Sequence, residues 1–415
     1  MTTALRAGAS SSEEMYVQAG LVHTRAARVI DGRLADLYIY SSADLNEETL
    51  PSLIGGTFVG RVVRAVPGVD AVFVDILPNV TGFLAARHTD GAIHEGARVL
   101  VKVIKEAHGD KGPQLSAIGL TAERTALQKN FHQVKPRTRV DTPLVAEAQI
   151  VRDHVSKRMT HVWFDTAQSL KRAQDYARVQ APDALPLLHQ ESKGEAFDAE
   201  MIDAQIDAAL NPRVPLPCGG WITLESTEGF TAIDVNSGGF NVMDVSDAAL
   251  EINRQAAMEI ARQVRLRSIG GLIVIDFIQM KAKAQRAKLE TSLKQALAHD
   301  PHPCQVAPLS PFGVIEMTRR RTSPSLESML TDPAAAAGRV LSFAHITDRL
   351  VRALEREAAT APGLPIEIRL SAALGSWLRA RPTLLQALEA RTAARVALHT
   401  RADWARPRFD VHVLR

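Results

Sequence analysis

The sequence predicts an α/β multidomain protein in which a small closed β-barrel lies near the N-terminal end. Its 415 residues are about three times the usual domain length, which predicts two to four domains. Five short β-like segments between residues 57 and 117 predict the barrel. A strand, a long amphipathic helix and a second strand between residues 229 and 278 predict a sheet covered by helices. With 46% hydrophobic and 23% charged residues, the composition excludes collagen, a coiled coil and a disordered chain.

The sequence also argues against several cellular settings. The longest apolar segments, around residues 71–77 and 271–278, are far shorter than the roughly 18 residues that a membrane helix needs. Residues 1–14 are polar and rich in serine, so we expect a loose tail and no signal peptide. Cys218 and Cys304 stand 86 positions apart, so neither a disulfide framework nor a complete zinc site is expected. We therefore expect a cytoplasmic protein without membrane contact.

Positive charge is concentrated at the C-terminal end of the chain. Residues 339–415 hold 13 Arg, no Lys and 7 Asp or Glu, a net charge of +6, which leaves −3 for the remaining residues. A basic module of this kind is compatible with a polyanionic partner. Arginines scattered over helix faces are more often ordinary solvated surface, and charge alone favours that interpretation.

Turn signals divide the first third of the chain into short strands. Asp31-Gly32, between β-like residues 26–30 and 34–40, predicts a hairpin. Five strands within about 65 residues are typical of an OB-type barrel, the commonest small barrel that binds oligonucleotides, although other small β-barrels fit the same spacing. The predicted barrel strands are residues 57–65, 71–77, 82–84, 98–105 and 113–117.

Helices and strands alternate in the rest of the chain. A strand is predicted at 162–164, with helices at 167–177 and 199–210. Strands at 220–225, 229–235 and 271–278, with a helix at 246–267 between the last two, form a crossover unit that places both strands in one sheet. After a low-complexity link at 334–337, a small α/β module is predicted: a helix at 343–358, a strand at 366–370, helical residues 374–394 interrupted at Pro382, and strands at 396–399 and 409–414.

Two carboxylates stand out in the predicted sheet. Asp234 and Asn236 share one face of their strand because side chains alternate, and Asp276 interrupts an otherwise apolar strand. Burying an ionised carboxylate without a partner is very costly, so two buried carboxylates predict a cation. Mg²⁺ is held by one or two protein carboxylates, with waters and substrate phosphates completing its coordination. The alternative is that these aspartates cap turns or pair with arginines such as Arg262 or Arg265.

Candidate nucleic-acid contacts lie in two other places. Phe73 and Phe83 fall on barrel strands, where a base can stack on an aromatic ring, although phenylalanine in so small a barrel is more often core. Lys111, in the turn at 109–112, is placed to reach a phosphate. Arg319 and Arg320 belong to a run of three arginines that fits a phosphate contact or a solvated turn equally well. The sequence contains no zincin, α/β-hydrolase or P-loop motif.

Long motifs in the C-terminal half resemble the ribonuclease E/G family. They are residues 219–238 (GGWITLESTEGFTAIDVNSG), 259–267 (EIARQVRLR) with 270–278 (GGLIVIDFI), and 312–319 (FGVIEMTR) with 323–326 (SPSL). From Tyr16 onwards the resemblance extends more weakly over most of the chain.

The resemblance implies an S1-type OB barrel inserted in an RNase H-like domain, followed by a DNase I-like catalytic domain and a small α/β C-terminal domain. The implied boundaries are 1–14 for a flexible tail, 15–54 and 121–215 for the two parts of the RNase H-like domain, 55–120 for the barrel, 216–330 for the catalytic domain, 331–338 for a linker and 339–415 for the C-terminal domain. It further implies that Asp234 and Asp276 hold the catalytic Mg²⁺, that Asn236 orients the metal-bound group or the scissile phosphate, and that Phe73, Phe83 and Lys111 bind RNA.

Two features depart from the family pattern. A Cys-Pro-x-Cys zinc link is expected shortly after Leu326, but residues 327–337 contain no cysteine. Zinc and a zinc-linked dimer are therefore not expected, and the oligomeric state is left open. Residues 121–142 are too few for the family's full sensor of a 5′-monophosphate, so selectivity for such RNA ends is not implied.

These observations together predict a Mg²⁺-dependent endoribonuclease that cleaves single-stranded RNA in RNA processing or decay, with Mn²⁺ able to replace Mg²⁺. The alternative is a catalytically weak RNA-binding protein that retains the family's scaffold. Asp234, Asn236 and Asp276 favour the nuclease, because a binding module has no need of paired, buried carboxylates.

Overall fold

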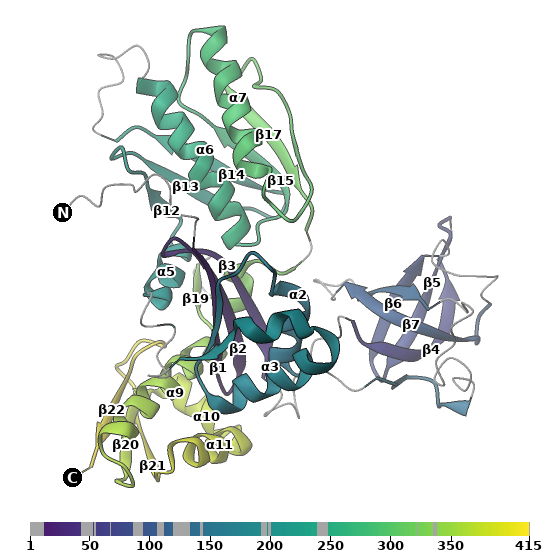
Figure 1. Cartoon of the computed structure of the whole chain (residues 1–415), viewed down its shortest axis with the longest axis vertical. Helices are drawn as coiled ribbons and strands as arrows, with labels where there is room; N and C mark the ends of the chain where they lie inside the picture. Colours follow the sequence, from purple (N-terminus) through teal and green to yellow (C-terminus); the bar gives the residue numbers. More distant parts are fainter. Residues whose placement is uncertain are drawn as a thin grey trace. The chain divides into compact units, whose positions relative to one another are not determined.

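The computed structural model describes residues 12–42, 53, 55–66, 68–85, 94–105, 112–118, 133–141, 144–191, 197, 201–238, 248–321, 323–334 and 338–414. The chain divides into two compact units (Figure 1): Asn46–Val145 form one, and Met1–Leu45 together with Ala146–Arg415 form the other. Each unit is described by itself. No helix within the described ranges combines the length and the apolar character that crossing a bilayer demands.

The smaller unit is a closed barrel. Strand β5 pairs with both β4 and β6, and the order β5-β6-β8-β7-β4 closes the ring. This architecture is compatible with an OB-type domain, and all five predicted barrel strands are confirmed. Val62, Val74 and Leu115 belong to the core inside the barrel. The strands are β4 (Thr57–Ala65), β5 (Ala71–Leu77), β6 (Val80–Ala85), β7 (Arg98–Lys105), β8 (Gln114–Ala117) and β9 (Thr138–Arg139), which pairs with β4.

The first sheet of the larger unit has the order β11-β10-β1-β2-β3. The predicted hairpin at Asp31-Gly32 is confirmed, because β2 and β3 are antiparallel on either side of it. Apolar residues pack on both faces of the sheet, so helices cover both. The elements are β1 (Glu13–Ala19), β2 (His23–Ile30), β3 (Arg33–Ser41), α2 (Ala146–His154), β10 (His161–Phe164), α3 (Ala167–Gln180), the 3₁₀-helix η4 (Pro182–Leu187), β11 (Leu188–Gln190) and α5 (Ile202–Ala209).

The second sheet has the order β12-β13-β14-β15-β17-β16. Strands β14 and β15 are parallel and joined through the long helix α6, which confirms the predicted crossover unit. Helices α6 and α7 lie along one face of this sheet (Figure 1). The elements are β12 (Arg213–Pro215), β13 (Trp221–Ser226), β14 (Phe230–Asn236), α6 (Ala248–Leu266), β15 (Gly271–Asp276), α7 (Lys283–Leu297), β16 (Cys304–Val306) and β17 (Val314–Arg319).

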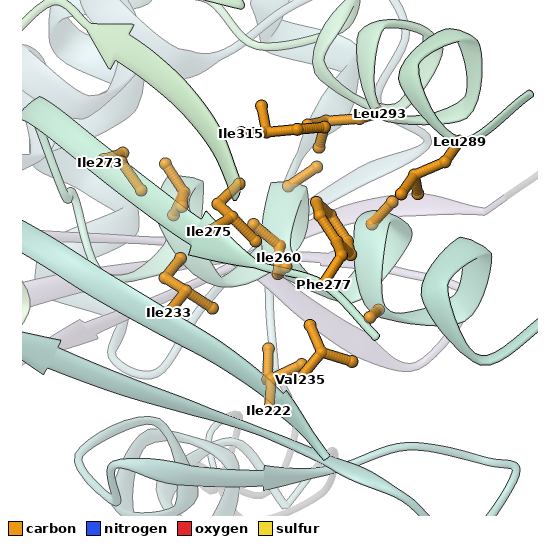
Figure 2. Packing of buried hydrophobic residues seen from close by; sticks show 14 of the residues in the cluster. Ile222, Ile233, Val235, Ile260, Ile273, Ile275, Phe277, Leu289, Leu293 and Ile315 are labelled. Atoms are coloured by element: carbon orange, nitrogen blue, oxygen red, sulfur yellow. The ribbon is translucent and has the colours of Figure 1, made fainter. Parts of the chain in front are cut away.

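Alternation along these strands decides which side chains meet the helices. Ile233, Ile275 and Ile315 point into the core that also holds Ile260 of α6 and Leu293 of α7 (Figure 2). All five side chains are at most 1% exposed, and truncating one of them to alanine would cost about 2–5 kcal/mol. The residues between them on each strand therefore lie on the opposite face, which these two helices leave open.

The C-terminal part of the larger unit contains a three-stranded sheet in the order β21-β20-β22. Every predicted helix and strand of this module is present. Before it, Thr331–Pro333 and Arg339–Leu341 pair as an antiparallel hairpin on either side of the low-complexity link. The elements are α8 (Leu326–Leu330), β18 (Thr331–Pro333), β19 (Arg339–Leu341), α9 (Phe343–Thr360), β20 (Ile366–Ser371), α10 (Ala372–Arg379), α11 (Pro382–Thr392), β21 (Val396–Arg401) and β22 (Phe409–Val413).

Residues just before β2 pack on this C-terminal module. Leu21 belongs to the same core as Leu350 and Leu370. The Asp348 carboxylate accepts a hydrogen bond from the Val22 N–H at 3.0 Å. A Cβ on Gly20 would lie 2.6 Å from that carboxylate, so only glycine permits the approach.

Candidate active site

Two carboxylates stand side by side on the open face of the second sheet. Asp234 of β14 is in register with Asp276 of the parallel strand β15. Neighbouring strands lie about 4.8 Å apart, so the two side chains leave adjacent positions. Val235 and Ile275, the adjoining strand residues, are 6% and 0% exposed and point to the helices. Period-two alternation therefore sends both aspartates to the open face.

The two carboxylates are exposed, which corrects the expectation that they are buried. The run from Leu272 to Ile275, directly before Asp276, is continuously apolar in sequence, but helices cover only one face of β15, and Leu272 is 41% exposed on the other. The cost of burying charge therefore does not explain why these aspartates are present. Two like charges at neighbouring positions repel each other, and a cation bound by both carboxylates would relieve that repulsion.

The expected arginine partners are engaged elsewhere. Arg262 pairs with Glu259, and Arg265 makes a bidentate contact with Asp36 of β3. Within the part of the chain that the structure describes, neither Asp234 nor Asp276 has a cationic partner.

Asn236 holds one of the carboxylates in place. Its Nδ2 donates a hydrogen bond to Asp234 Oδ2 at 2.6 Å, which leaves Oδ1 available. The backbone around Asn236 is tightly fitted: a Cβ on Gly220 would lie 2.4 Å from the Asn236 carbonyl oxygen. Gly238, two residues later, has a φ of +63°, which favours glycine. The structure thus brings together the three residues that the sequence singled out for catalysis.

The donor set suits a hard divalent cation. Across the described ranges, no group of three or more His, Cys, Asp and Glu side chains is arranged to hold a metal ion by itself. Two carboxylates and an amide oxygen supply only part of a coordination shell, as is typical of Mg²⁺ sites that use waters and substrate phosphate for the rest. Asp234 and Asp276 would be the protein ligands of such an ion.

Sequence reasoning missed two other residues on this face. Arg213 of β12 is in register with Thr223 of β13, which is in register with Asp234. Trp221 of β13 is in register with Asn236. The signal was available, since Arg213 precedes buried Val214 and Trp221 precedes buried Ile222, and alternation places both on the open face.

Phe73 and Phe83 lie together on the outside of the barrel. They are cross-strand partners on β5 and β6, with ring centroids 6.2 Å apart and planes inclined at 74°. Both are partly exposed and neither belongs to the barrel core, which removes the core alternative. Arg64 of β4 is a third member that the sequence did not reveal, with its Cζ 4.8 Å from the Phe73 ring centroid. Lys111 lies outside the described residues.

The two candidate arginines of β17 and its end have different environments. Arg319 is 5% exposed and its guanidinium is fully engaged, with Nε and Nη2 on the Asp300 carboxylate at 2.8 and 3.0 Å and Nη1 on the Ile269 carbonyl at 2.9 Å. It continues the inward series of Ile315 and does not reach the surface, so we do not retain it as an RNA contact. Arg320 is exposed.

Comparison with known proteins places this site in a family. A sequence profile described as the ribonuclease E/G family matches residues 115–322, about half of the chain. The chain belongs to the ribonuclease E/G family. The resemblance of the long motifs is thereby confirmed, and the matched residues contain Asp234, Asn236 and Asp276.

Several ribonucleases are similar to the chain. Ribonuclease E of Nostoc sp. is 30% identical over 368 residues, which cover 69% of this chain and 54% of that protein. Ribonuclease G of Salmonella typhimurium is 26% identical over 404 residues, covering 76% of this chain and 81% of the relative. Ribonuclease E of Haemophilus influenzae is 34% identical over 217 residues, covering 50% of this chain and 23% of the relative. The chain thus spans about half the length of the Nostoc relative.

Proposed function

We propose that this chain is an endoribonuclease that cleaves single-stranded RNA with the help of Mg²⁺ in RNA processing or decay. The observation that carries the proposal is the register of Asp234 with Asp276 on an open sheet face, in a chain of the ribonuclease E/G family. In this proposal the barrel is S1-type, the first sheet belongs to an RNase H-like domain and the second is the DNase I-like catalytic sheet.

The reaction is the addition of water across one P–O bond of the RNA backbone, during which negative charge grows on the phosphate oxygens. Two exposed carboxylates alone repel this phosphate, so Asp234 and Asp276 need a cation before RNA can approach. A divalent ion held by Asp234 and Asp276 would supply the positive charge that the phosphate requires. Asn236 keeps the Asp234 carboxylate in one orientation through its 2.6 Å hydrogen bond.

The barrel would bind the RNA strand through stacking and charge. Phe73 and Phe83 each offer a partly exposed ring on the outside of the barrel, and a base stacked on such a ring contributes about 1–3 kcal/mol. Arg64 adds positive charge beside them. Binding should therefore weaken steeply as salt rises, because Lys and Arg release counterions from the RNA.

Cleavage of a fluorescent single-stranded RNA tests the proposal, with Mg²⁺ and with EDTA. Asp276→Asn should lower the rate at least about 100-fold while leaving RNA affinity nearly unchanged, because it removes one metal ligand and no contact with the bases. Glu251→Gln is the matched control, since it neutralises an exposed carboxylate on α6, which packs against the opposite face of the sheet. It should cleave at the wild-type rate.

Two results would contradict the proposal. Full activity of Asp276→Asn would show that the metal assignment is wrong. Salt-sensitive RNA binding without cleavage, with Mg²⁺ and with Mn²⁺, would instead indicate an RNA-binding protein that retains the scaffold of its family.

A further inference from the structure

An arginine lies over a tryptophan ring at one side of the carboxylate pair. The Cζ of Arg213 lies 3.7 Å from the centroid of the Trp221 ring. Arg213 is exposed and Trp221 is partly buried. The same ring abuts the turn after Asn236, since a Cβ on Gly238 would lie 3.3 Å from Trp221 Cζ3. The tryptophan thus connects the guanidinium to the segment that carries Asn236.

The charge of Arg213 is not neutralised within the described part of the chain. Among the described residues, no ion pair or side-chain hydrogen bond forms at its guanidinium, whereas Arg262 and Arg265 of helix α6 both contact carboxylates. Stacking on Trp221 restricts the side chain before any ligand arrives, which reduces the entropy lost when its N–H groups bind one. A planar guanidinium with free donors is suited to phosphate.

The row of strand positions next to the carboxylate pair carries the reverse charge. Glu225 of β13 and Glu316 of β17 are exposed on the same open face. They lie one pleat away from Asp234 and Asp276, because Glu225 is in register with Ala232 and Glu316 with Val274. Both repel phosphate. Arg213 lies in the same row across the sheet as Asp234, through Thr223, so a polyanionic strand that crosses the carboxylate pair is attracted along this row towards Arg213 and repelled from the adjacent row of glutamates.

We propose that Arg213, positioned by Trp221, binds the RNA backbone phosphate next to the scissile one, and that the strand runs from the carboxylate pair towards β12. Strand β12 lies two strand spacings from β14, about 10 Å, which a long arginine side chain partly spans. The inference rests on the proposed nuclease site, and it assigns a phosphate subsite to residues outside that site. Arg213 here is a substrate-binding residue and Trp221 a positioning residue.

Steady-state cleavage of a single-stranded RNA tests the inference, with KM, kcat and the salt dependence of RNA affinity measured for each variant. Arg213→Ala should raise KM about tenfold with kcat changed less than about twofold, as expected for loss of one charged hydrogen bond. The slope of log affinity against log salt should become shallower by about 0.7, the value for one phosphate contact on a single strand. These effects should be the same for RNAs of different sequence, because phosphate carries no base information.

Further variants separate charge from geometry and folding. Arg213→Lys should keep the salt slope while raising KM, because the charge remains and the flat guanidinium is lost. Trp221→Phe should raise KM less than Arg213→Ala and leave the slope unchanged. Arg254→Ala is the matched control, since it removes an exposed arginine from α6, which packs against the opposite sheet face.

The outcomes distinguish this inference from the proposed function. If wild type cleaves RNA and Arg213→Ala matches Arg254→Ala in KM and salt slope, the subsite is wrong and the nuclease stands. If wild type binds RNA without cutting it, the nuclease proposal fails. The subsite is then tested by comparing the Kd and the salt slope of Arg213→Ala with those of Arg254→Ala. If wild type neither binds nor cuts single-stranded RNA, both fail.

Discussion

The substitution Arg319→Met should lower the free energy of unfolding without changing the affinity for RNA. The Arg319 and Asp300 side chains are 4% and 3% exposed, so the variant leaves a buried carboxylate without its counter-ion. Removing one partner of a buried ion pair costs about 3–5 kcal/mol. The Ile269 carbonyl also loses its 2.9 Å donor, which adds about 1 kcal/mol. The loss is a large part of the 5–15 kcal/mol that usually holds a folded domain.

Urea denaturation of the full chain measures this loss, and fluorescence anisotropy with a single-stranded RNA measures affinity. The double variant Arg319→Met/Asp300→Leu should recover most of the lost free energy of unfolding, because an apolar pair has no charge to desolvate. Arg320→Met, at the exposed neighbouring position, should change the free energy of unfolding by less than about 0.5 kcal/mol. A fall in RNA affinity for Arg319→Met at unchanged stability would refute the reasoning.

Other predictions concern the barrel and the buried titratable groups. Phe83→Ala should weaken RNA binding by about 1–3 kcal/mol in anisotropy at an unchanged melting temperature, and a lower melting temperature with full affinity would contradict its role. Burial raises the pKa of Asp165 to about 7, so the folded chain holds a proton that the unfolded chain has lost, and stability should fall as pH rises from about 4 to about 7. Asp165→Asn should make the melting temperature less dependent on pH over this range, and an unchanged pH dependence would contradict the assignment. Burial lowers the pKa of His345 to about 3, so stability should fall as pH drops from about 6.5 to about 3. The melting temperature of His345→Leu should depend less on pH over that range than that of wild type.

The strand periodicity predicted the positions of the site residues well, because it is a local property of the chain. Alternation placed Asp234 and Asn236 on one face, and the crossover unit brought Asp276 beside them. Exposure was not predictable in the same way. Whether the second face of β15 is covered depends on where helices pack, and the apolar residues of that strand do not encode it. Leu272 is accordingly exposed although the strand is apolar from Leu272 to Ile275.

Arg319 illustrates a conflict between two sequence signals. Three consecutive arginines are typical of a charged surface, but Ile315, Met317 and Arg319 also continue one inward-facing series along β17. The Arg319 side chain follows the inward-facing series and is buried, because Asp300 supplies a buried counter-charge. Asp300 lies 19 residues earlier in a turn, and nothing in its local pattern identifies it as the partner.

The contact between Leu21 and the C-terminal module has a consequence for synthesis on the ribosome. The Val22 N–H donates its hydrogen bond to Asp348, 326 positions later in the chain. The Ala19 carbonyl accepts one from the Arg391 guanidinium, 372 positions later. Domains generally fold in the order in which they emerge, and closing such long loops is slow. The turn between β1 and β2 must therefore remain incompletely packed until α9 and α11, which carry Asp348 and Arg391, have left the ribosome. A nascent chain interrupted before α9 would expose Leu21 and the surface around it, which makes the unfinished product a substrate for chaperones or proteases.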